Sequence, residues 1–198
     1  MAGGRSTRMG APKALLKFGA VTLIERTVTE LRRVFADVIV VAALPGEAGF
    51  ALPKLDATIV FDPVPFEGPL LALGLGLEAA RGEIAFVCPC DAPALRAEVA
   101  LGLCAAVDDY DAAIPLIDGR FQPLLAAYHK RCQSAAQALL AGGERRLRAL
   151  VPLLKVRILD ERAMRELDPQ LSALLNLNTP DDYRAALRRS RSAMSAPS

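Results

Sequence analysis

The chain has 198 residues, of which 53% are hydrophobic and 23% charged, and its net charge is +2. This length and composition suit one globular domain with a sizeable core and exclude an intrinsically disordered chain. The balanced charge argues against a protein that coats nucleic acid, because such proteins present a strongly basic face. No apolar run is long enough to cross a bilayer, so no membrane partner is expected.

The cysteine pattern and the first residues bear on the compartment. Cys88, Cys90, Cys104 and Cys132 form no C-x-x-C pair. A disulfide framework is not expected from this pattern, and reduced thiols are typical of cytoplasmic proteins. The first residues are glycine and arginine rather than the apolar run of a signal peptide. We therefore expect a cytoplasmic protein, as a monomer or a weak oligomer.

Short apolar runs alternate with longer stretches at helical spacing. Thr22 is a plausible N-cap for the first helix. In chain order, the predicted elements are a helix over 23–35, strands over 38–43 and 57–61, a helix over 69–81, a strand over 84–88, a helix over 96–107, strands over 112–116 and 124–128, helices over 130–141 and 145–151, and strands over 156–159 and 174–177.

A last helix is predicted to begin at Pro180. Thr179 can cap it, proline suits the first helical position, and Asp182 lies near the positive end of the helix dipole. Residues 191–198 are small and polar and are predicted to be a disordered tail, so the domain is expected to span residues 1–190.

The order of the predicted elements indicates the fold. Alternating strands and helices predict a single-domain, Rossmann-like α/β fold with a mostly parallel sheet flanked by helices. In such sheets, ligands bind at the carboxyl ends of the strands. Three segments are expected there: the glycine-rich loop that opens the chain, the loop over 62–68, and the loop that holds Asp91.

The opening loop, residues 2–13, reads A-G-G-R-S-T-R-M-G-A-P-K. Gly3 and Gly4 let backbone amides approach a ligand closely, and Arg8 and Lys13 add positive charge. Amides and cations together predict a polyphosphate cradle. The loop matches neither the Walker A pattern nor G-x-G-x-x-G. From charge alone, a basic and flexible amino terminus explains it equally well.

Asp91 directly follows the apolar run over 84–88, so a rigid strand would hold its carboxylate at the sheet edge. Mg²⁺ typically takes only one or two protein carboxylates and fills its other positions with phosphate oxygens and water. Asp91 is therefore the candidate metal ligand, and capping of the next turn is its structural alternative.

Five segments of the chain resemble, in order, the motifs of the molybdenum cofactor guanylyltransferases, a branch of the nucleotidyltransferases. The double glycine matches this branch, whereas cytidylyl and isoprenoid relatives usually carry Ala-Ala-Gly. The five segments are A-G-G-R-S-T-R-M-G-x-x-K at 2–13, G-P-L at 68–70, C-P-C-D-A-P at 88–93, G-E-R-R at 143–146 and N-L-N-T-P at 176–180.

The resemblance implies the nucleotidyltransferase fold and the transfer of GMP from GTP to the phosphate of molybdenum-molybdopterin, with release of pyrophosphate. It implies Mg²⁺ as the cofactor and GTP and molybdopterin as partners, with molybdoenzyme chaperones as further candidates. The implied nucleotide site is Ala2, Gly3, Gly4, Lys13, Asp62 and Asp91. The implied acceptor site is Arg8, Gly68, Asn176 and Asn178. The implied catalytic residues are Arg8, Lys13 and Asp91, with Asp91 on the metal.

The local pattern leaves alternatives open for several of these residues. Asp62 is equally well explained as a surface aspartate before Pro63, and Asn178 suits the turn before the last helix. The segment over 41–45 has no polar side chain to read a base, so cytidylyl transfer to the same pterin is a rival.

The chain also departs from the family in lacking an apolar strand before the glycine loop. Such a strand would lie at the centre of the sheet, so we expect either a rearranged sheet or a groove in its place. A start placed too late would explain the departure. A chain that truly lacks the strand would favour a catalytically inactive protein that binds pterin or nucleotide.

Overall fold

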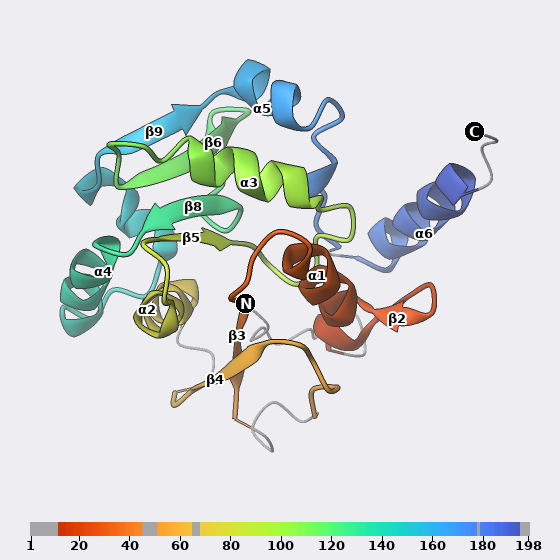
Figure 1. Ribbon diagram of the computed structural model, residues 1–198, viewed down its shortest axis with the longest axis horizontal. Coiled ribbons are helices and arrows are strands. Elements are labelled where there is room, and N and C mark those ends of the chain that lie inside the picture. The colour runs from red at the N-terminus through yellow and green to blue at the C-terminus, as the bar shows by residue number, and fades with distance from the viewer. Residues whose placement is uncertain (1–11, 45–50, 65–67, 178, 195–198) are drawn as a thin grey trace.

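The computed structural model describes residues 12–44, 51–64, 68–177 and 179–194, in which strands alternate with helices and form three separate sheets (Figure 1). The strands are β1 (Lys17–Phe18), β2 (Val21–Thr22), β3 (Ile39–Ala43), β4 (Thr58–Asp62), β5 (Ile84–Val87), β6 (Ala112–Ile117), β7 (Arg120–Phe121), β8 (Ala126–His129) and β9 (Val156–Leu159). The α-helices are α1 (Leu23–Arg32), α2 (Pro69–Ala79), α3 (Ala97–Ala105), α4 (Cys132–Ala141), α5 (Glu161–Leu167) and α6 (Pro180–Met194).

The sheet is only partly parallel. β3 and β4 form a parallel two-stranded sheet, and β6 pairs with β9 in parallel at the edge of the larger sheet. The larger sheet otherwise has the order β5-β8-β6-β7, and these neighbours run antiparallel. The expected α/β architecture is confirmed, but the sheet is mixed. The turn at Asp118 and Gly119 reverses the chain, so β7 pairs antiparallel with β6. The periodicity of the sequence did not predict this antiparallel pairing.

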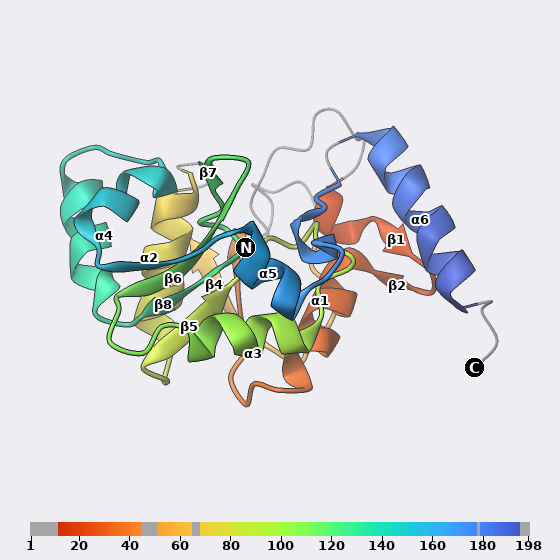
Figure 2. The same ribbon diagram turned by 90° about the horizontal axis from the view of Figure 1, so that it is seen from above.

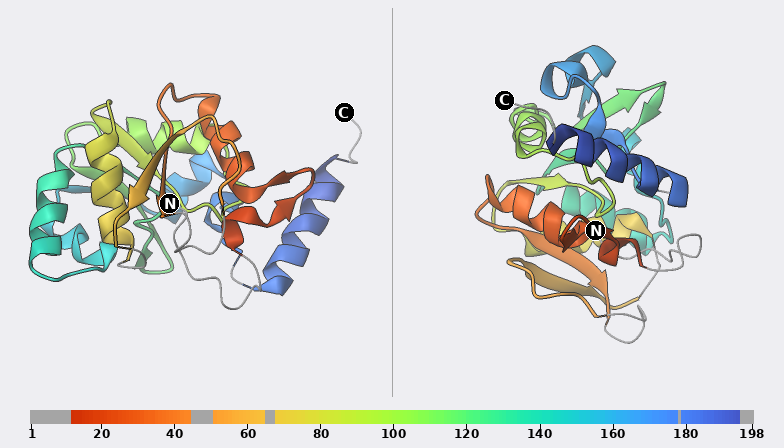
Figure 3. Two further views of the ribbon diagram at one scale, coloured as in Figure 1. Left: turned by 90° about the horizontal axis from the view of Figure 1, so that it is seen from below. Right: turned by 90° about the vertical axis from the view of Figure 1, so that its right-hand side faces the viewer.

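Helices cover both faces of the larger sheet, as the alternation of side chains along β6 shows. Ala112 and Ile114 pack in the core under α2 and α4, whereas Ala113 packs in the core under α3 and α5. Figure 3 shows α2 between α4 and the β3–β4 strands. The strands β6 and β8 at the centre of the larger sheet are therefore buried on both faces, which explains their continuous apolar runs.

Two predicted elements near the carboxyl end are wrong. The segment over 145–151 forms short 3₁₀ turns (Leu147–Ala149 and Val151–Leu153) instead of an α-helix, because Pro152 has no N–H to continue one. The segment over 174–177 is not a strand, and its Leu177 N–H bonds outside any sheet. Sequence periodicity also missed α5, although Asp160 caps it by accepting from the Ala163 N–H at 2.8 Å.

The capping predictions are confirmed. Thr22 and Glu25 form a reciprocal capping box at α1. At α6 the Asp182 N–H donates to the Thr179 hydroxyl at 3.1 Å, and the Thr179 N–H donates to the Asp182 carboxylate at 2.8 Å. Figure 2 shows α6 at the outer edge beside β1 and β2. The helix ends at Met194, beyond the expected boundary at residue 190.

Asp111, just before β6, joins three segments through its carboxylate. It accepts from the Lys155 backbone N–H at 2.8 Å and from the Arg131 guanidinium at 2.5 Å. Burial acts to raise the pKa of Asp111, but these hydrogen bonds outweigh it, so the pKa lies below its ordinary value. The stabilisation is therefore present above about pH 4 and is lost as the pH falls through the lowered pKa.

We expect Asp111→Asn to lower the free energy of unfolding by about 1–3 kcal/mol at pH 7, because two donors lose their charged acceptor. Urea unfolding at pH 7 and near pH 3 measures this, and the difference between parent and variant should shrink at the acid end. Asp109→Asn, at an exposed neighbouring carboxylate, is the control. An equal difference at both pH values would contradict the assigned role.

A groove of about 650 Å³ lies between the β3–β4 sheet and the larger sheet, and residues of β3, β5, α1 and α2 line it. Among the described residues no strand lies between β3 and β5, and the expected groove is therefore confirmed. Cys88, Cys90, Cys104 and Cys132 form no disulfide in this structure. No helix in the described ranges is long and apolar enough to span a membrane.

Candidate active site

Lys13 and Asp91 come together although 78 residues separate them in the sequence. Lys13 begins a 3₁₀ turn (Lys13–Leu15), and Asp91 lies in the loop that follows β5. The Lys13 Nζ donates to Asp91 Oδ2 at 2.7 Å, with side-chain exposures of 24% and 12%. A carboxylate this buried needs a charged partner, and Lys13 provides it. The predicted cation and carboxylate thus meet at the carboxyl end of a strand.

Helix α1 holds the Asp91 loop in place. The Arg26 Nε donates to the Pro93 carbonyl at 2.7 Å, and Glu30 accepts from the Ala97 N–H at 2.8 Å. The Arg26 guanidinium also lies over the Phe18 ring, 5.3 Å from its centroid. Sequence analysis missed these positioning residues, because charges on one face of a helix are usually a solvated surface.

We expect Arg26→Ala to lower kcat by roughly five- to tenfold, because a lost hydrogen bond of about 1 kcal/mol lets the Asp91 loop drift. The KM for nucleotide should change little, since the contacts of Arg26 are with Pro93 and Phe18, neither of which is a nucleotide candidate. Arg26→Lys should restore part of kcat, because an ammonium can also donate to the Pro93 carbonyl.

The matched control is Arg162→Ala, at an exposed arginine on α5. An equal loss of kcat in both arginine variants would contradict a positioning role for Arg26.

The segment before α6 meets the Asp91 loop from the other side. The Leu177 N–H donates to the Asp91 carbonyl at 3.1 Å, and the Leu177 side chain is buried against Phe18 and Leu23. The exposed Asn176 is therefore held one residue from this contact. Asn178 lies outside the described residues.

Asp62 is the last residue of β4 and is buried. Its Oδ1 accepts from the Val64 N–H at 2.9 Å in an Asx-type turn. The alternative of a surface aspartate is therefore wrong, because the side chain is buried and hydrogen-bonded, and a contact with ribose or base remains a prediction.

Gly68 caps the amino end of α2 with a φ of 100°, in the left-handed region that favours glycine. A Cβ added there would lie 2.7 Å from the Arg145 carbonyl oxygen, and the Leu70 N–H donates to that same oxygen at 3.4 Å. The structure therefore joins the G-P-L and G-E-R-R motifs.

Glu144 orders the G-E-R-R turn. Its carboxylate accepts from the Arg146 guanidinium at 2.7 Å and from the backbone N–H groups of Arg145 and Arg146. The Arg146 side chain, followed by these backbone donors, lowers the pKa of Glu144 to about 2. Glu144 is therefore ionised at neutral pH and fixes the carbonyl against which Gly68 packs.

Gly68→Ala is expected to cost about 2–4 kcal/mol of stability, because a strained φ adds to a contact with backbone that cannot move freely. Gly119→Ala is the matched control, since Gly119 also has a positive φ, of 69°, but no atom lies within 4 Å of its Cβ position. Thermal unfolding should show the larger loss in Gly68→Ala, and equal losses would mean that the close approach to Arg145 is immaterial.

The remaining nucleotide and acceptor candidates, Ala2, Gly3, Gly4 and Arg8, lie outside the described residues. Within the described ranges no group of three or more His, Cys, Asp or Glu side chains could hold a metal. Asp91 nevertheless fits Mg²⁺, which needs only one or two protein carboxylates. Burial raises the pKa of Cys88 to about 11 and raises that of Cys90, so neither thiol adds charge beside Asp91 at neutral pH.

The sequence relatives define the class of protein. Residues 1–158 match the family described as MobA-like NTP transferase domain. The chain is 32% identical over 188 residues to the probable molybdenum cofactor guanylyltransferase of Carboxydothermus hydrogenoformans, covering 95% of this chain and 93% of that protein. It is 31% identical over 188 residues to the molybdenum cofactor guanylyltransferase of Desulfosudis oleivorans, covering 94% and 91%. These matches define a nucleotidyltransferase.

Solved structures share the fold. The molybdopterin-guanine dinucleotide biosynthesis protein A from Archaeoglobus fulgidus superposes with a TM-score of 0.81 at 22% identity, covering 96% of each chain. The 2-C-methyl-D-erythritol 4-phosphate cytidylyltransferase from Thermus thermophilus superposes with 0.68 at 21% identity, covering 91% and 94%. By its sequence matches, the chain belongs to the molybdenum cofactor guanylyltransferase family of MobA-like NTP transferases.

Proposed function

We propose that this protein transfers GMP from GTP to the phosphate of molybdenum-molybdopterin and releases pyrophosphate. Family membership supports the reaction. The observation in the structure that carries the proposal is the contact of Lys13 with Asp91. A cation for the triphosphate and a carboxylate for a metal thus lie within one reaction centre.

Alignment and charge neutralisation dominate the chemistry of such a transfer. An oxygen of the acceptor phosphate attacks the α-phosphorus of GTP, and the bond to pyrophosphate breaks. Lys13 neutralises the triphosphate, and Arg8 neutralises charge that develops on the α-phosphate or pyrophosphate. Mg²⁺, held by Asp91, supplies further positive charge to the phosphate oxygens when bound.

The ion pair between Lys13 and Asp91 is expected to couple the binding of nucleotide to the binding of Mg²⁺. In the free protein, Lys13 occupies Oδ2 of Asp91 at 2.7 Å. Triphosphate oxygens would accept hydrogen bonds from the Lys13 ammonium, and the Asp91 carboxylate would then be free to hold Mg²⁺. Nucleotide and Mg²⁺ are therefore expected to bind cooperatively, because each relieves the pairing that opposes the other.

We propose that the acceptor binds on the side of Gly68 and Asn176. Asn176 is held next to the Asp91 loop through Leu177, and Gly68 packs against the arginine-bearing turn at Arg145. Asn178 and Arg8 complete this side in the proposal. The nucleotide side consists of Ala2, Gly3, Gly4, Lys13, Asp62 and Asp91.

The test combines Mg²⁺-dependent pyrophosphate release, with GTP and molybdenum-molybdopterin as substrates, and calorimetry with GTP and CTP. We expect release with GTP and tighter binding of GTP than of CTP. Tighter binding of CTP would assign the protein to cytidylyl transfer instead.

A second candidate is a protein that binds pterin or nucleotide without transfer. The groove between β3 and β5 favours it, because no described strand joins β3 and β4 to the larger sheet. Pterin binding without pyrophosphate release, in the parent and in Asp91→Ala alike, would establish that candidate.

The same proposal includes a cytoplasmic location and a monomeric or weakly oligomeric state. It also includes molybdoenzyme chaperones as further partners.

A further inference from the structure

Phe18 adjoins both of the residues that hold the Asp91 loop in place. Phe18 is the second residue of β1, and only 7% of it is exposed. The Arg26 guanidinium lies 5.3 Å from the centroid of its ring, and Leu177 shares one small apolar cluster with it. Arg26 and Leu177 come from opposite ends of the described chain, and each donates a hydrogen bond to a backbone carbonyl of the loop. One buried ring therefore links two separate contacts with the loop.

The Arg26 side chain needs such a support because Arg26 is an exposed residue. A long exposed side chain loses rotamer freedom when it forms a hydrogen bond. The face of an aromatic ring attracts a guanidinium and restricts it in advance, which lowers that loss. The Arg26 Nε then donates to the Pro93 carbonyl at 2.7 Å. Pro93 lies two residues after Asp91, so the position of this donor bears directly on the carboxylate.

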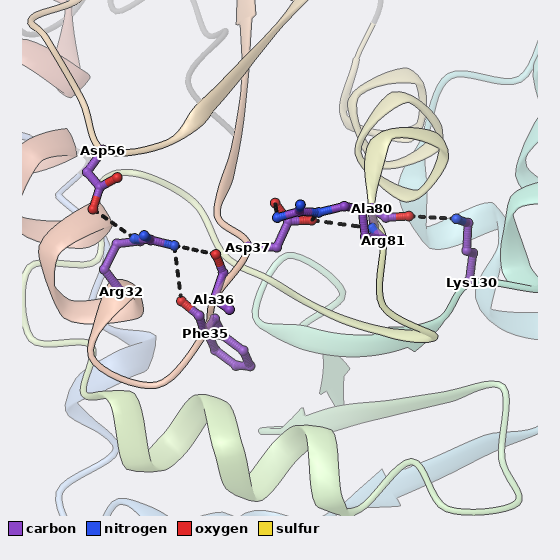
Figure 4. A network of polar contacts seen from close by, with 8 residues as sticks. All are labelled: Arg32, Phe35, Ala36, Asp37, Asp56, Ala80, Arg81 and Lys130. Atoms are coloured by element: carbon purple, nitrogen blue, oxygen red, sulfur yellow. Dashed lines mark hydrogen bonds and ion pairs between the residues drawn. The ribbon is translucent and has the colours of Figure 1, made fainter.

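Helix α1, which carries Arg26, is fixed at both ends by contacts that do not include the Phe18 ring. A capping box holds its amino end. At its carboxyl end, Arg32 pairs with Asp56 at 2.9 Å and donates to two carbonyls of the turn that follows (Figure 4). A change at Phe18 is therefore expected to move the Arg26 side chain and to leave the helix in place.

Helix α6 holds the backbone of Phe18. The Tyr183 hydroxyl donates to the Lys17 carbonyl, which belongs to the peptide bond between Lys17 and Phe18. The side chains of Tyr183 and Leu187 also pack against the apolar cluster that contains Phe18 and Leu177. The helix that follows the loop contact of Leu177 therefore also fixes the hairpin that carries the ring (Figure 2).

A short hydrogen-bonded path joins Phe18 to Lys13. The Leu16 N–H donates to the Lys13 carbonyl at 3.1 Å, and the Leu23 N–H donates to the Leu16 carbonyl at 2.9 Å. The β1–β2 hairpin lies between these two contacts. The segment that presents the ring to the supports of the Asp91 loop is thus continuous with the segment that presents Lys13.

We propose that Phe18 is a positioning residue for the transfer, and that it sets the place of the Asp91 loop through Arg26 and Leu177. This inference rests on the proposed function, in which Asp91 holds Mg²⁺ and Lys13 neutralises the triphosphate. Phe18 acts through its neighbours and not on a substrate. It limits how far the Asp91 carboxylate can move relative to Lys13.

The first test measures amide hydrogen exchange by NMR in the full chain, without nucleotide or Mg²⁺. Phe18→Leu keeps an apolar side chain but removes the ring face. We expect the Leu177 N–H to exchange roughly fivefold faster or more, because its acceptor in the Asp91 loop is less firmly held. The amides of β8 should keep the parent's rates, since that strand packs in two other clusters. The matched control is Phe121→Leu, at an exposed phenylalanine of β7, which should leave the Leu177 N–H unchanged.

The second test follows pyrophosphate release, with GTP and molybdenum-molybdopterin, across a Mg²⁺ titration. Phe18→Leu should lower kcat by roughly two- to fivefold, the range expected for the loss of an exposed cation–π contact. The Mg²⁺ concentration for half-maximal release should rise by a similar factor. A smaller folded fraction would lower kcat without changing that concentration, so the shift separates positioning from stability.

A double variant tests the route through Arg26. In Phe18→Leu/Arg26→Ala, the two losses of kcat should combine to less than their product, because both changes act on one contact. Tyr183→Phe tests the other support without removing a ring. It loses only the hydroxyl that donates to the Lys17 carbonyl, so it should speed exchange of the Leu177 N–H and raise the Mg²⁺ requirement by about twofold.

Unchanged exchange of the Leu177 N–H in both Phe18→Leu and Tyr183→Phe would overturn the proposal. So would an equal acceleration of the β8 amides, which would mean that the ring supports the whole fold and not the loop. Losses of kcat that multiply in the double variant would also overturn it. A parent chain that releases no pyrophosphate would contradict the proposed function instead, and the exchange rates would still decide whether Phe18 positions the loop.

Discussion

Asp91→Asn is expected to lower kcat for pyrophosphate release by roughly 10²–10³-fold, the largest activity loss of any single change in this chain. The substitution keeps the shape of the side chain but removes the charge that, in the proposed mechanism, holds Mg²⁺ and orders the phosphates. The loop itself should stay in place, because Leu177 bonds to the backbone carbonyl of Asp91 rather than to its carboxylate. Steady-state pyrophosphate release across a Mg²⁺ titration measures the effect.

The control for this variant is Asp56→Asn, at a carboxylate whose side chain is 78% exposed and which pairs with Arg32. It should leave kcat unchanged. Full activity of Asp91→Asn at the parent's Mg²⁺ requirement would remove Asp91 from the reaction centre. Unchanged unfolding curves for both variants would show that the loss is chemical rather than structural.

Lys13→Gln is expected to lower kcat/KM for GTP by roughly 10²-fold, because the triphosphate loses a charge-assisted partner. It should also destabilise the free protein by about 1–3 kcal/mol, since the Asp91 carboxylate, 12% exposed, loses its cation. The two effects have one cause and are separable: enzyme kinetics report the first and urea unfolding in the absence of nucleotide reports the second.

Lys17→Gln, four residues away at an exposed lysine, is the control for this variant. The double variant Lys13→Gln/Asp91→Asn should recover most of the lost stability, because no unpaired charge remains. Additive losses of stability in the double variant would show that the ion pair is not the cause.

The local elements around the site were predictable from the sequence. Apolar runs place the strands that precede Asp62 and Asp91, and the capping box at Thr22 begins α1 within one residue of the expected helix. These features depend on side chains within a few residues of one another, so the sequence shows them directly. The motif order likewise predicted the family that the comparisons confirmed.

Pairing and positioning were not predictable in the same way. The antiparallel neighbours β5, β8 and β6 come from distant parts of the chain, and periodicity gives each strand without its partner. Arg26 and Pro93, which are joined by a hydrogen bond, are 67 residues apart, so no local sequence pattern predicts their contact. Gly68 matched a motif, but only the structure shows that the Arg145 carbonyl excludes a side chain there.

The sequence by itself determined which segments are strands and helices, which side chains carry charge next to the strand ends, and which family the chain resembles. Only the tertiary structure decided that Lys13 reaches Asp91, that the sheet is mixed, and that an apolar groove runs between β3 and β5. The physical reason is the range of the forces involved. Capping and periodicity act within a helical turn or a strand, whereas ion pairs and sheet edges form between residues that only the packed core brings together.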